Sequence, residues 1–401
     1  MASSRIEILD SNLDLITYIK APVPLNKAGS ILKYSKELSQ YGQCNFRVSA
    51  YDTNLAALGD IFQPHKYHVR ITRNGVTVWQ GAIIENPRRT KDYIEVIAAE
   101  YLWYLDKILL NRNLDQNLVT PTSSSDPAVY RRFNSGTMSS AVTTIMNEVI
   151  ARWAGTNHAL ASVALGTVEN PDYPPNMTDG NNPAKPLTGP WSFGDGISAP
   201  LLQFDFQSVL YVMRSFGAYT YADFNIDKDL KFNFQKFIGN NAHYDVNFVW
   251  GQHGNAVDFN LPRLGQRQVD DLWGIASDAN GVIYTYEQTD QPAIASEGIL
   301  EAVAAYSDIK DQATLNARLE AELPMISTPD AAAWTFVLDE KAYPLGVYDI
   351  GDIVSTQVNH TNLKASARKR IVGISVDLNS TGRELTTVQL NTPLPWQYGA
   401  S

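Results

Sequence analysis

The chain has 401 residues, of which 44% are hydrophobic and 18% are charged, and its formal net charge at pH 7 is −10. This composition supplies enough apolar side chains for sizeable cores and excludes wholesale disorder, while the length is that of about two to four domains. No basic run is longer than residues 368–370, so the acidic balance excludes a protein that binds nucleic acid by neutralising phosphates. We therefore expect no sequence-specific nucleic-acid binding.

Residues 1–110 are predicted to form a first small antiparallel β-barrel domain. Strands are expected at residues 5–9, 43–51, 67–73, 76–83 and 93–98, followed by a short helix within 101–109. Cys44 is the only cysteine, so no intrachain disulfide can form, and we expect it to be buried on its strand. The segment begins without a secretory signal peptide, which predicts synthesis in a cytosol.

Asn74-Gly75 lies between two alternating apolar and polar runs, a pattern typical of a type I′ hairpin. That turn predicts three cross-strand pairs, namely Arg70 with Trp79, Ile71 with Val78 and Thr72 with Thr77. Because side chains alternate along a strand, each face of the hairpin then has four residues. One face is expected to hold Val69, Ile71, Val76 and Val78, and the other Arg70, Thr72, Thr77 and Trp79.

Residues 111–218 are predicted to form a helical and loop domain. Helical spacing places one apolar stripe on a helix over 137–153, made of Val142, Ile145, Met146, Val149, Ile150 and Trp153. Proline, glycine and asparagine punctuate residues 155–200, which predicts a long irregular excursion. A second helix is expected over 206–216, ending at Gly217.

A hairpin at 219–238 together with residues 335–401 is predicted to form a second β-barrel domain, interrupted by an inserted α+β domain at 239–334. The insert is expected to have strands at 273–277 and 282–286 and a helix through Leu315, Leu319 and Leu323 that Pro324 ends. Strands are expected at 334–338, 353–358, 369–378 and 385–390, with the last two paired. The predicted class is mainly β with α insertions. No apolar run approaches the ~20 residues of a membrane span.

Two stretches carry a resemblance to a known family. Residues 67–105 combine an Asn-Gly hairpin, the pattern V-x-V-W-x-G-x-I, a strand and A-A-E-Y-L-x-Y-L. Near the C-terminus the chain reads Gly351-Asp352-Ile353-Val354, then RIVGISVDL at 370–378, then Gly382-Arg383-Glu384. In this order the patterns resemble the tail-hub, or baseplate-hub, proteins of tailed phages, a trimeric family with two barrels in each subunit.

The resemblance implies a structural virion protein and no enzyme. It implies a homotrimer that closes the distal end of the tail tube, connects the tube to receptor-binding or fibre proteins, and leaves a channel for the tape measure protein and for DNA ejection. The implied partners are the tail tube or distal tail protein, the tape measure protein and a tail fibre. The implied location is the distal tail tip of the virion, after assembly in the host cytoplasm. Strands 5–9, 44–51 and 385–390 are the expected sheet edges.

We expect no catalytic, cofactor-binding or metal-binding site. Asp223, Asn225, Asp227 and Asp229 imitate a calcium loop, but Lys228 and Phe234 replace the glycine and glutamate that such a loop needs. The histidines form no zinc motif; His65 and His68 are expected at the surface, and His243 and His253 are weak metal candidates. Lys369 and Arg370 are expected to extend to solvent at a strand edge.

A carbohydrate-binding or glycan-degrading β protein is the alternative, since the chain has eight tryptophans and twenty tyrosines. A glycosidase needs a pair of carboxylates. The acids available for such a pair are Asp270, Asp271, Glu297, Glu301 and Glu340, and we expect them on a solvated face.

Overall fold

The structure is a computed structural model of the whole chain. It describes residues 4–393 except for short gaps and one longer gap. These gaps are residues 21, 111–130, 134–135, 155, 157–158, 173–177, 180–181, 187–188, 191, 194–201, 205–206, 242–244, 253, 262–267, 278–280, 307–308, 310, 328–333, 340–344 and 361–362.

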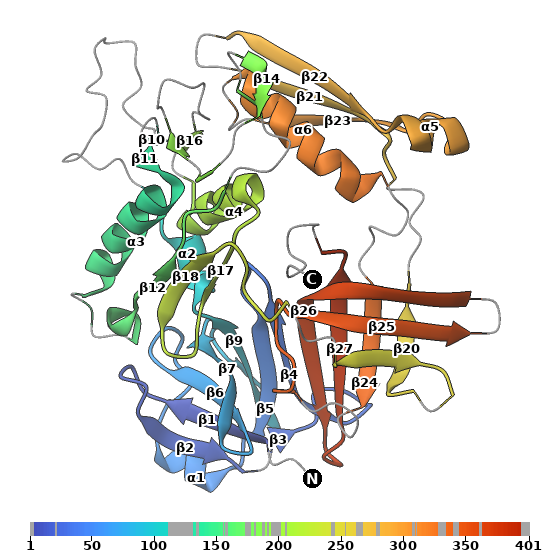
Figure 1. Cartoon of the computed structure of the whole chain (residues 1–401). Coiled ribbons are helices and arrows are strands. Elements are labelled where there is room, and N and C mark those ends of the chain that lie inside the picture. The colour runs from blue at the N-terminus through green and yellow to red at the C-terminus, as the bar shows by residue number, and fades with distance from the viewer. Residues whose placement is uncertain are drawn as a thin grey trace.

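The predicted class, mainly β with α insertions, is confirmed. A 15-stranded sheet joins the N-terminal and C-terminal β-rich segments, because β4 pairs antiparallel with β26 (Figure 1). Its N-terminal strands are β1 Ser4–Leu9, β2 Leu15–Ile19, β3 Pro22–Val23, β4 Ser30–Glu37, β5 Gln43–Ser49, β6 His68–Arg73, β7 Val76–Ile83, β8 Arg88–Arg89 and β9 Tyr93–Glu100. Its later strands are β19 Asn247–Trp250, β20 Ala256–Asn260, β24 Trp334–Asp339, β25 Ile353–His360, β26 Leu363–Asn379 and β27 Glu384–Asn391.

Helix α1 lies within the first segment, and α5, α6 and the β21–β23 sheet lie between β20 and β24 of the later one. The other helices and small sheets lie between the two segments in the chain. The helices are α1 Thr53–Ala57, α2 Leu102–Lys107, α3 Met138–Ala154, the 3-10 helix η1 Ala159–Ser162, α4 Val209–Thr220, α5 Gln291–Glu297 and α6 Gln312–Ile326. The small sheets are β10 Arg131–Phe133 with β16 Leu202–Phe204, β11 Gly136–Thr137 with β15 Ser192–Phe193, β13 Thr178–Asp179 with β14 Asn182–Pro186, β12 Ala164–Val168 with β17 Asp223–Ile226 and β18 Lys231–Gln235, and β21 Asp271–Ser277 with β22 Ile283–Thr289 and β23 Glu301–Tyr306. Much of the predicted excursion at 155–200 lies outside the described residues.

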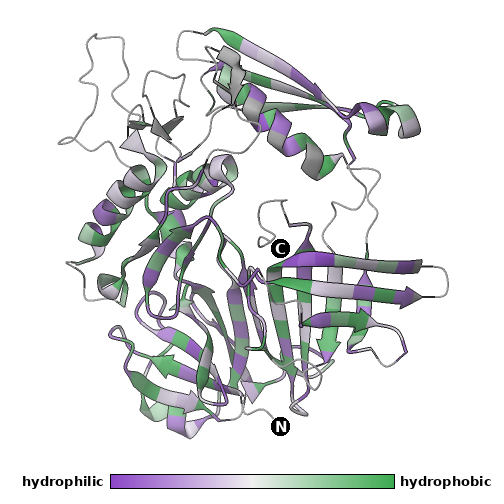
Figure 2. Cartoon of the chain, in the orientation of Figure 1, coloured by the Kyte–Doolittle hydropathy of each residue, from purple (hydrophilic) through white to green (hydrophobic). Residues whose placement is uncertain are grey.

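Two apolar clusters hold the described chain together. The first β-rich segment and the last share one cluster, in which Phe46 and Trp79 lie with Phe336 and Val388. The second cluster gathers α2, α3, α4, the β17–β18 hairpin and α6, and the expected α3 stripe is buried in it apart from the half-buried Ile150. In Figure 2 apolar and polar residues alternate along the strands of the large sheet. The two β-rich segments are therefore one packed unit.

The hairpin between β6 and β7 has the predicted turn but a shifted register. Asn74 and Gly75 have φ values of 50° and 83°, as a type I′ turn requires. Thr72 pairs with Thr77 as predicted, but Ile71 pairs with Trp79 and Arg70 with Gln80, so the other two predicted pairs are wrong. The cause is a β-bulge next to Ile71, which inserts one extra residue and turns every later side chain to the opposite face.

The bulge decides where Trp79 lies. Its side chain is only 2% exposed and joins Val69 and Ile71 in the core, whereas Val76 is 63% exposed. The indole nitrogen Nε1 donates a hydrogen bond of 2.9 Å to the carbonyl oxygen of Ser35 on β4. The predicted division of the hairpin faces is therefore wrong from Val78 onward, while Val76 and Thr77 keep the predicted pairing.

Both predicted helix ends are wrong. Helix α4 runs through Gly217 to Thr220 and ends where Tyr221 adopts a left-handed φ of 55°. Gly217 is needed for space, since a Cβ there would lie 2.8 Å from the carbonyl oxygen of Ala222. Helix α6 continues past Pro324 to Ile326, because proline crowds the turn before it and leaves the following residues free to stay helical.

The strand order of the sheet also differs from the prediction of which strands lie at its edges. Each of the three strands expected at an edge is an inner strand: β1 lies between β2 and β6, β5 between β4 and β9, and β27 between β24 and β26. Alternating apolar residues do not reveal an edge, because inner and outer strands of a half-buried antiparallel sheet share that pattern.

The division of the chain into domains stays a prediction, and strand pairing bears on two of its boundaries. The β17–β18 hairpin, expected in the second barrel, pairs instead with β12, because its phenylalanines pack into the helical cluster. Strands β19 and β20, expected in the insert, pair with β25 and β24 of the C-terminal segment. The three-stranded sheet β21–β23 is covered on one face by α6, whose Leu315, Leu319 and Leu323 are buried.

Candidate functional site

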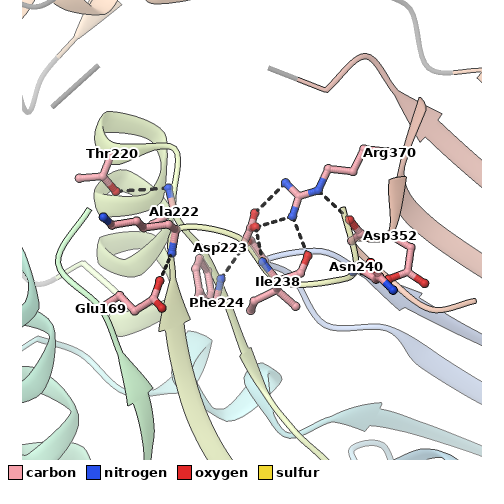
Figure 3. Close-up of polar contacts among 12 residues, drawn as sticks. Glu169, Thr220, Ala222, Asp223, Phe224, Ile238, Asn240, Asp352 and Arg370 are labelled. Atoms are coloured by element: carbon pink, nitrogen blue, oxygen red, sulfur yellow. Dashed lines mark hydrogen bonds and ion pairs between the residues drawn. The ribbon is translucent and has the colours of Figure 1, made fainter. Parts of the chain in front are cut away.

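Arg370 on β26 lies at a junction where the C-terminal β-rich segment meets the β17–β18 hairpin (Figure 3). Its guanidinium forms an ion pair with Asp223 at the start of β17. It also donates to the carbonyl oxygens of Gly351, at 3.0 Å, and of Ile238, at 2.8 Å. The ring of Phe237 lies 4.2 Å from the guanidinium carbon. The prediction that Arg370 extends to solvent is wrong, because its side chain is used to join distant segments.

Asp223 makes polar contacts with two different segments of the chain. Besides Arg370, it accepts a hydrogen bond of 2.9 Å from the backbone nitrogen of Ile238. Asp223 is 6% exposed and Arg370 is 5% exposed, so both charges are buried. Burial raises the pKa of the Asp223 carboxyl, and the neighbouring Arg370 counteracts that rise. A buried pair of this kind fixes geometry, because removing either charge leaves the other without compensation.

Two glycines allow the loops at this junction to touch. A Cβ on Gly351 would lie 1.9 Å from the carbonyl oxygen of Ile238, and a Cβ on Gly239 would lie 2.3 Å from the carbonyl carbon of Gly351. Next to them, Asp352 accepts hydrogen bonds from the backbone nitrogens of Asn240, at 2.7 Å, and of Asp349, at 2.9 Å. These contacts hold the 237–240 and 349–352 loops against each other.

A second buried ion pair joins the two β-rich segments directly. Arg73 at the end of β6 lies 3.2 Å from Glu384 at the start of β27, with side-chain exposures of 3% and 2%. Arg73 also donates to the carbonyl oxygen of Leu345 at 3.3 Å. Four residues of the C-terminal family pattern, the glycine Gly351 and the charged Asp352, Arg370 and Glu384, thus lie at contacts between segments. Arg370 lies within β26 and Glu384 begins β27, and these charges beside apolar runs were the signal of this role in the sequence.

A crevice of about 410 Å³ lies beside this junction. Strands β4, β7 and β9 line one side, and the β17–β18 turn and the 238–239 and 349–352 loops line the other. Glu100 of β9 lies in it and accepts a hydrogen bond of 2.7 Å from the backbone nitrogen of Gly42. Burial raises the pKa of Glu100 to about 7, although Lys36 favours the charged form; Lys36 itself pairs with Asp349. Glu100 is therefore the group here that changes charge near neutral pH.

We expect this carboxyl to make stability depend on pH. Because its pKa is raised in the folded chain, its contribution is complete below the ordinary pKa near 4.5 and is lost as the pH rises through 7. The free energy of unfolding should fall by about 1 kcal/mol between pH 6 and 8, and by clearly less in a Glu100→Gln variant. Urea titrations of both proteins across this range measure it. An identical pH dependence in the two proteins would contradict the prediction.

The structure also shows where the other candidate site residues from the sequence lie. The acids of the calcium-like segment lie on the β17–β18 hairpin, where Asp223 pairs with Arg370 and Asp227 accepts from the backbone nitrogens of Asp229 and Lys231. Cys44 is buried as predicted. His65 is exposed as predicted and stacks on Trp103, but His68 is fully buried beside Tyr101, so its predicted surface position is wrong. His243 and His253 lie outside the described residues.

The acidic residues expected on a solvated face also include wrong predictions. Asp270 is fully buried and its Oδ1 accepts from the backbone nitrogen of Leu300 at 2.7 Å, and Asp271 is 7% exposed, so for these two the prediction is wrong. Glu301 is exposed. Glu340 and the side chain of Glu297 lie outside the described part. Lys369 is also buried, lying 4.2 Å over the ring of Trp334 and donating to Thr392, because β26 is an inner strand at this point.

Among the described residues, no three histidine, cysteine or acidic side chains are grouped closely enough to hold a metal ion. None of the helices in this described portion has both the length and the apolar character needed to cross a bilayer.

Comparison with known proteins finds similarity in fold, with little similarity in sequence. No family model matches the chain, and no curated protein sequence matches it. Among solved structures, the tail protein from Neisseria meningitidis MC58 is 11% identical, with a TM-score of 0.59 over 99% of each chain. The 43 kDa tail protein of prophage MuSo2 from Shewanella oneidensis is 10% identical, with a TM-score of 0.58 over 97% of this chain and 98% of that one.

The chain has the fold of phage tail proteins. A prophage tail protein from Listeria monocytogenes EGD-e, 11% identical, also matches over 98% of this chain and 97% of its own, with a TM-score of 0.50. The tail-protein fold thus includes both β-rich segments, the helices between them and the β21–β23 sheet. At the level of fold, the resemblance drawn from residues 67–105 and 351–390 is confirmed.

Proposed function

We propose that this chain is a tail hub: a structural protein, without enzymatic activity, at the distal tip or baseplate of a phage or phage-like tail. The observation that supports this most strongly is the end-to-end match to tail proteins, in which 97–99% of this chain and of the two tail proteins with the higher TM-scores superpose. Fold alone does not specify function. The hub patterns at 67–105 and 351–390, whose polar residues hold the segments together, add the specific role.

In this proposal three copies close into a ring at the end of the tail tube. Each subunit supplies two small β-barrel domains, and the pairing of β4 with β26 would keep them in a constant relation. Three such pairs give six similar positions, which match a hexameric tube through interfaces that close by rotation. The proposed partners are the tail tube or distal tail protein, the tape measure protein and a fibre or receptor-binding protein. A net charge of −10 suits a channel through which DNA passes without sticking.

The test has two parts. Native mass measurement of the purified chain, at several concentrations, should show a particle of three 44.5-kDa subunits. Electron microscopy of the same sample should show a ring with a central hole. Gold-labelled antibodies against the chain should then mark the distal tip of tails in the producing strain. Labelling along the whole tube, or tails without the protein, would contradict the hub assignment whatever the oligomeric state in solution.

A further inference from the structure

The β21–β23 sheet has one face that the described chain leaves uncovered. Helix α6 packs on one side, so that it lies between the sheet and the rest of the molecule (Figure 1). The opposite face has an apolar centre, with Trp273 39% exposed, Ile275 40%, Val303 67% and Ile283 69%. These side chains are neighbours, since Trp273 pairs with Val303, and Ser277, two residues beyond Ile275, pairs with Ile283. Exposed apolar patches of this kind mark sites of protein association.

The charged residues in this part of the sequence are all acidic. Residues 268–309 contain eight acidic residues and no lysine, arginine or histidine, in a chain whose formal net charge is −10. Two of these acids, Glu287 and Glu301, are exposed on the same face as the apolar side chains; in the strand register Trp273 lies opposite Glu287, and Asp271 opposite Glu301. The face is therefore apolar with a carboxylate border, and none of its residues is basic.

This charge pattern indicates what kind of surface fits. Two copies of the same face would bring carboxylates together, which disfavours self-association through it. The longest basic run of the chain, residues 368–370, is also unsuitable, because Lys369 and Arg370 are buried. The basic segment at 88–91, which includes β8, has Glu85 and Asp92 nearby in the sequence, and its Arg89 already pairs with Asp60. These two basic clusters of a second copy therefore offer little complementary charge.

We propose that the outer face of the β21–β23 sheet docks a different protein, whose contact surface has apolar side chains at its centre and lysine or arginine at its border. The apolar side chains would cover Trp273, Ile283 and Val303, and the cations would pair with Glu287 and Glu301. Such pairs speed association and set orientation, while the apolar centre supplies affinity. This goes beyond the proposed function, because the hub assignment does not say which surface holds a partner or what that partner's charge is.

The test uses a photo-crosslinking amino acid, p-benzoylphenylalanine, placed at Val303 in the full chain and, in a matched control, at the exposed Glu85. Cells that naturally produce the protein are irradiated, and crosslinked peptides are sequenced by mass spectrometry. We expect the Val303 position to crosslink a peptide of another protein, rich in lysine or arginine beside apolar residues. A Glu287→Lys/Glu301→Lys variant should reduce that crosslink at least tenfold, and Glu85→Lys should not change it.

Three results would overturn the proposal. These are a crosslink from Val303 to this same chain, a crosslink to an acidic or uncharged peptide, and the absence of any crosslink from Val303. Oxidative footprinting serves as a check without the unnatural residue: Trp273 should be oxidised readily in the purified chain and at least fivefold more slowly in the complex. Because crosslinking is read in cells, it can succeed or fail independently of the ring and the tip labelling that test the hub assignment.

Discussion

Replacing Arg370 by methionine is expected to lower the free energy of unfolding by about 3–5 kcal/mol at pH 7. The substitution keeps an apolar stem of similar length but leaves the Asp223 carboxylate buried without its cation. It also removes the donors to the carbonyl oxygens of Gly351 and Ile238. Urea denaturation followed by tryptophan fluorescence measures the change.

Two further variants and a change of pH separate this effect from a general loss of packing. Asp223→Asn combined with Arg370→Met should recover part of the loss, because no buried charge then remains unpaired. Arg383→Met, which breaks the exposed pair with Asp339, should cost less than about 1 kcal/mol. The Arg370→Met deficit should also narrow as the pH is lowered, since the unpaired Asp223 can then take up a proton. A double variant no more stable than Arg370→Met would argue against the ion pair as the cause.

Replacing Gly351 by alanine is expected to destabilise the chain by about 4 kcal/mol or more, which is exceptional for one methyl group. The new Cβ would lie 1.9 Å from the carbonyl oxygen of Ile238, so the 237–240 and 349–352 loops would have to separate. That movement would also weaken the contacts of Arg370 with both loops. Thermal and urea unfolding of the variant give the magnitude.

Gly346→Ala is the matched control. Gly346 has a φ of 105°, close to the 91° of Gly351, but a Cβ there would meet nothing within 4 Å. It should therefore show only the backbone cost of a left-handed conformation, about 1–2 kcal/mol. The difference between the two alanine variants isolates the close approach of the loops. Equal losses would mean that backbone conformation alone requires Gly351.

These two predictions bear on function through the geometry of the subunit. In the proposed ring, each subunit must hold its two β-rich segments at a constant relation. Arg370 and Gly351 lie where the C-terminal segment meets the hairpin that packs against the helices. Loss of either residue should therefore reduce assembly of the ring before it abolishes folding of the subunit.

Elements whose signals lie within a few residues could be predicted from the sequence. The Asn74-Gly75 turn, the buried stripe of α3 and the C-terminal hairpin of β26 and β27 all formed as expected. Their causes are local: positive φ at Asn and Gly, and apolar side chains repeating at the period of a helix or a strand. The polar and glycine pattern around residues 351–384 likewise identified the fold, although not the contacts that its residues make.

Only the tertiary structure decided features that depend on distant partners. Asp223 and Arg370 are 147 residues apart, so neither sequence neighbourhood shows that the other charge is there. One bulge beside Ile71 moved Trp79 into the core, and the absence of a side chain at Gly217 leaves room for the carbonyl oxygen of Ala222 beyond the end of α4. Inner and edge strands have the same alternation of apolar and polar residues, so the strand order of the 15-stranded sheet could not be predicted from the sequence. Pairing, register and buried charge are set by packing between segments, and local preference is too weak to determine them.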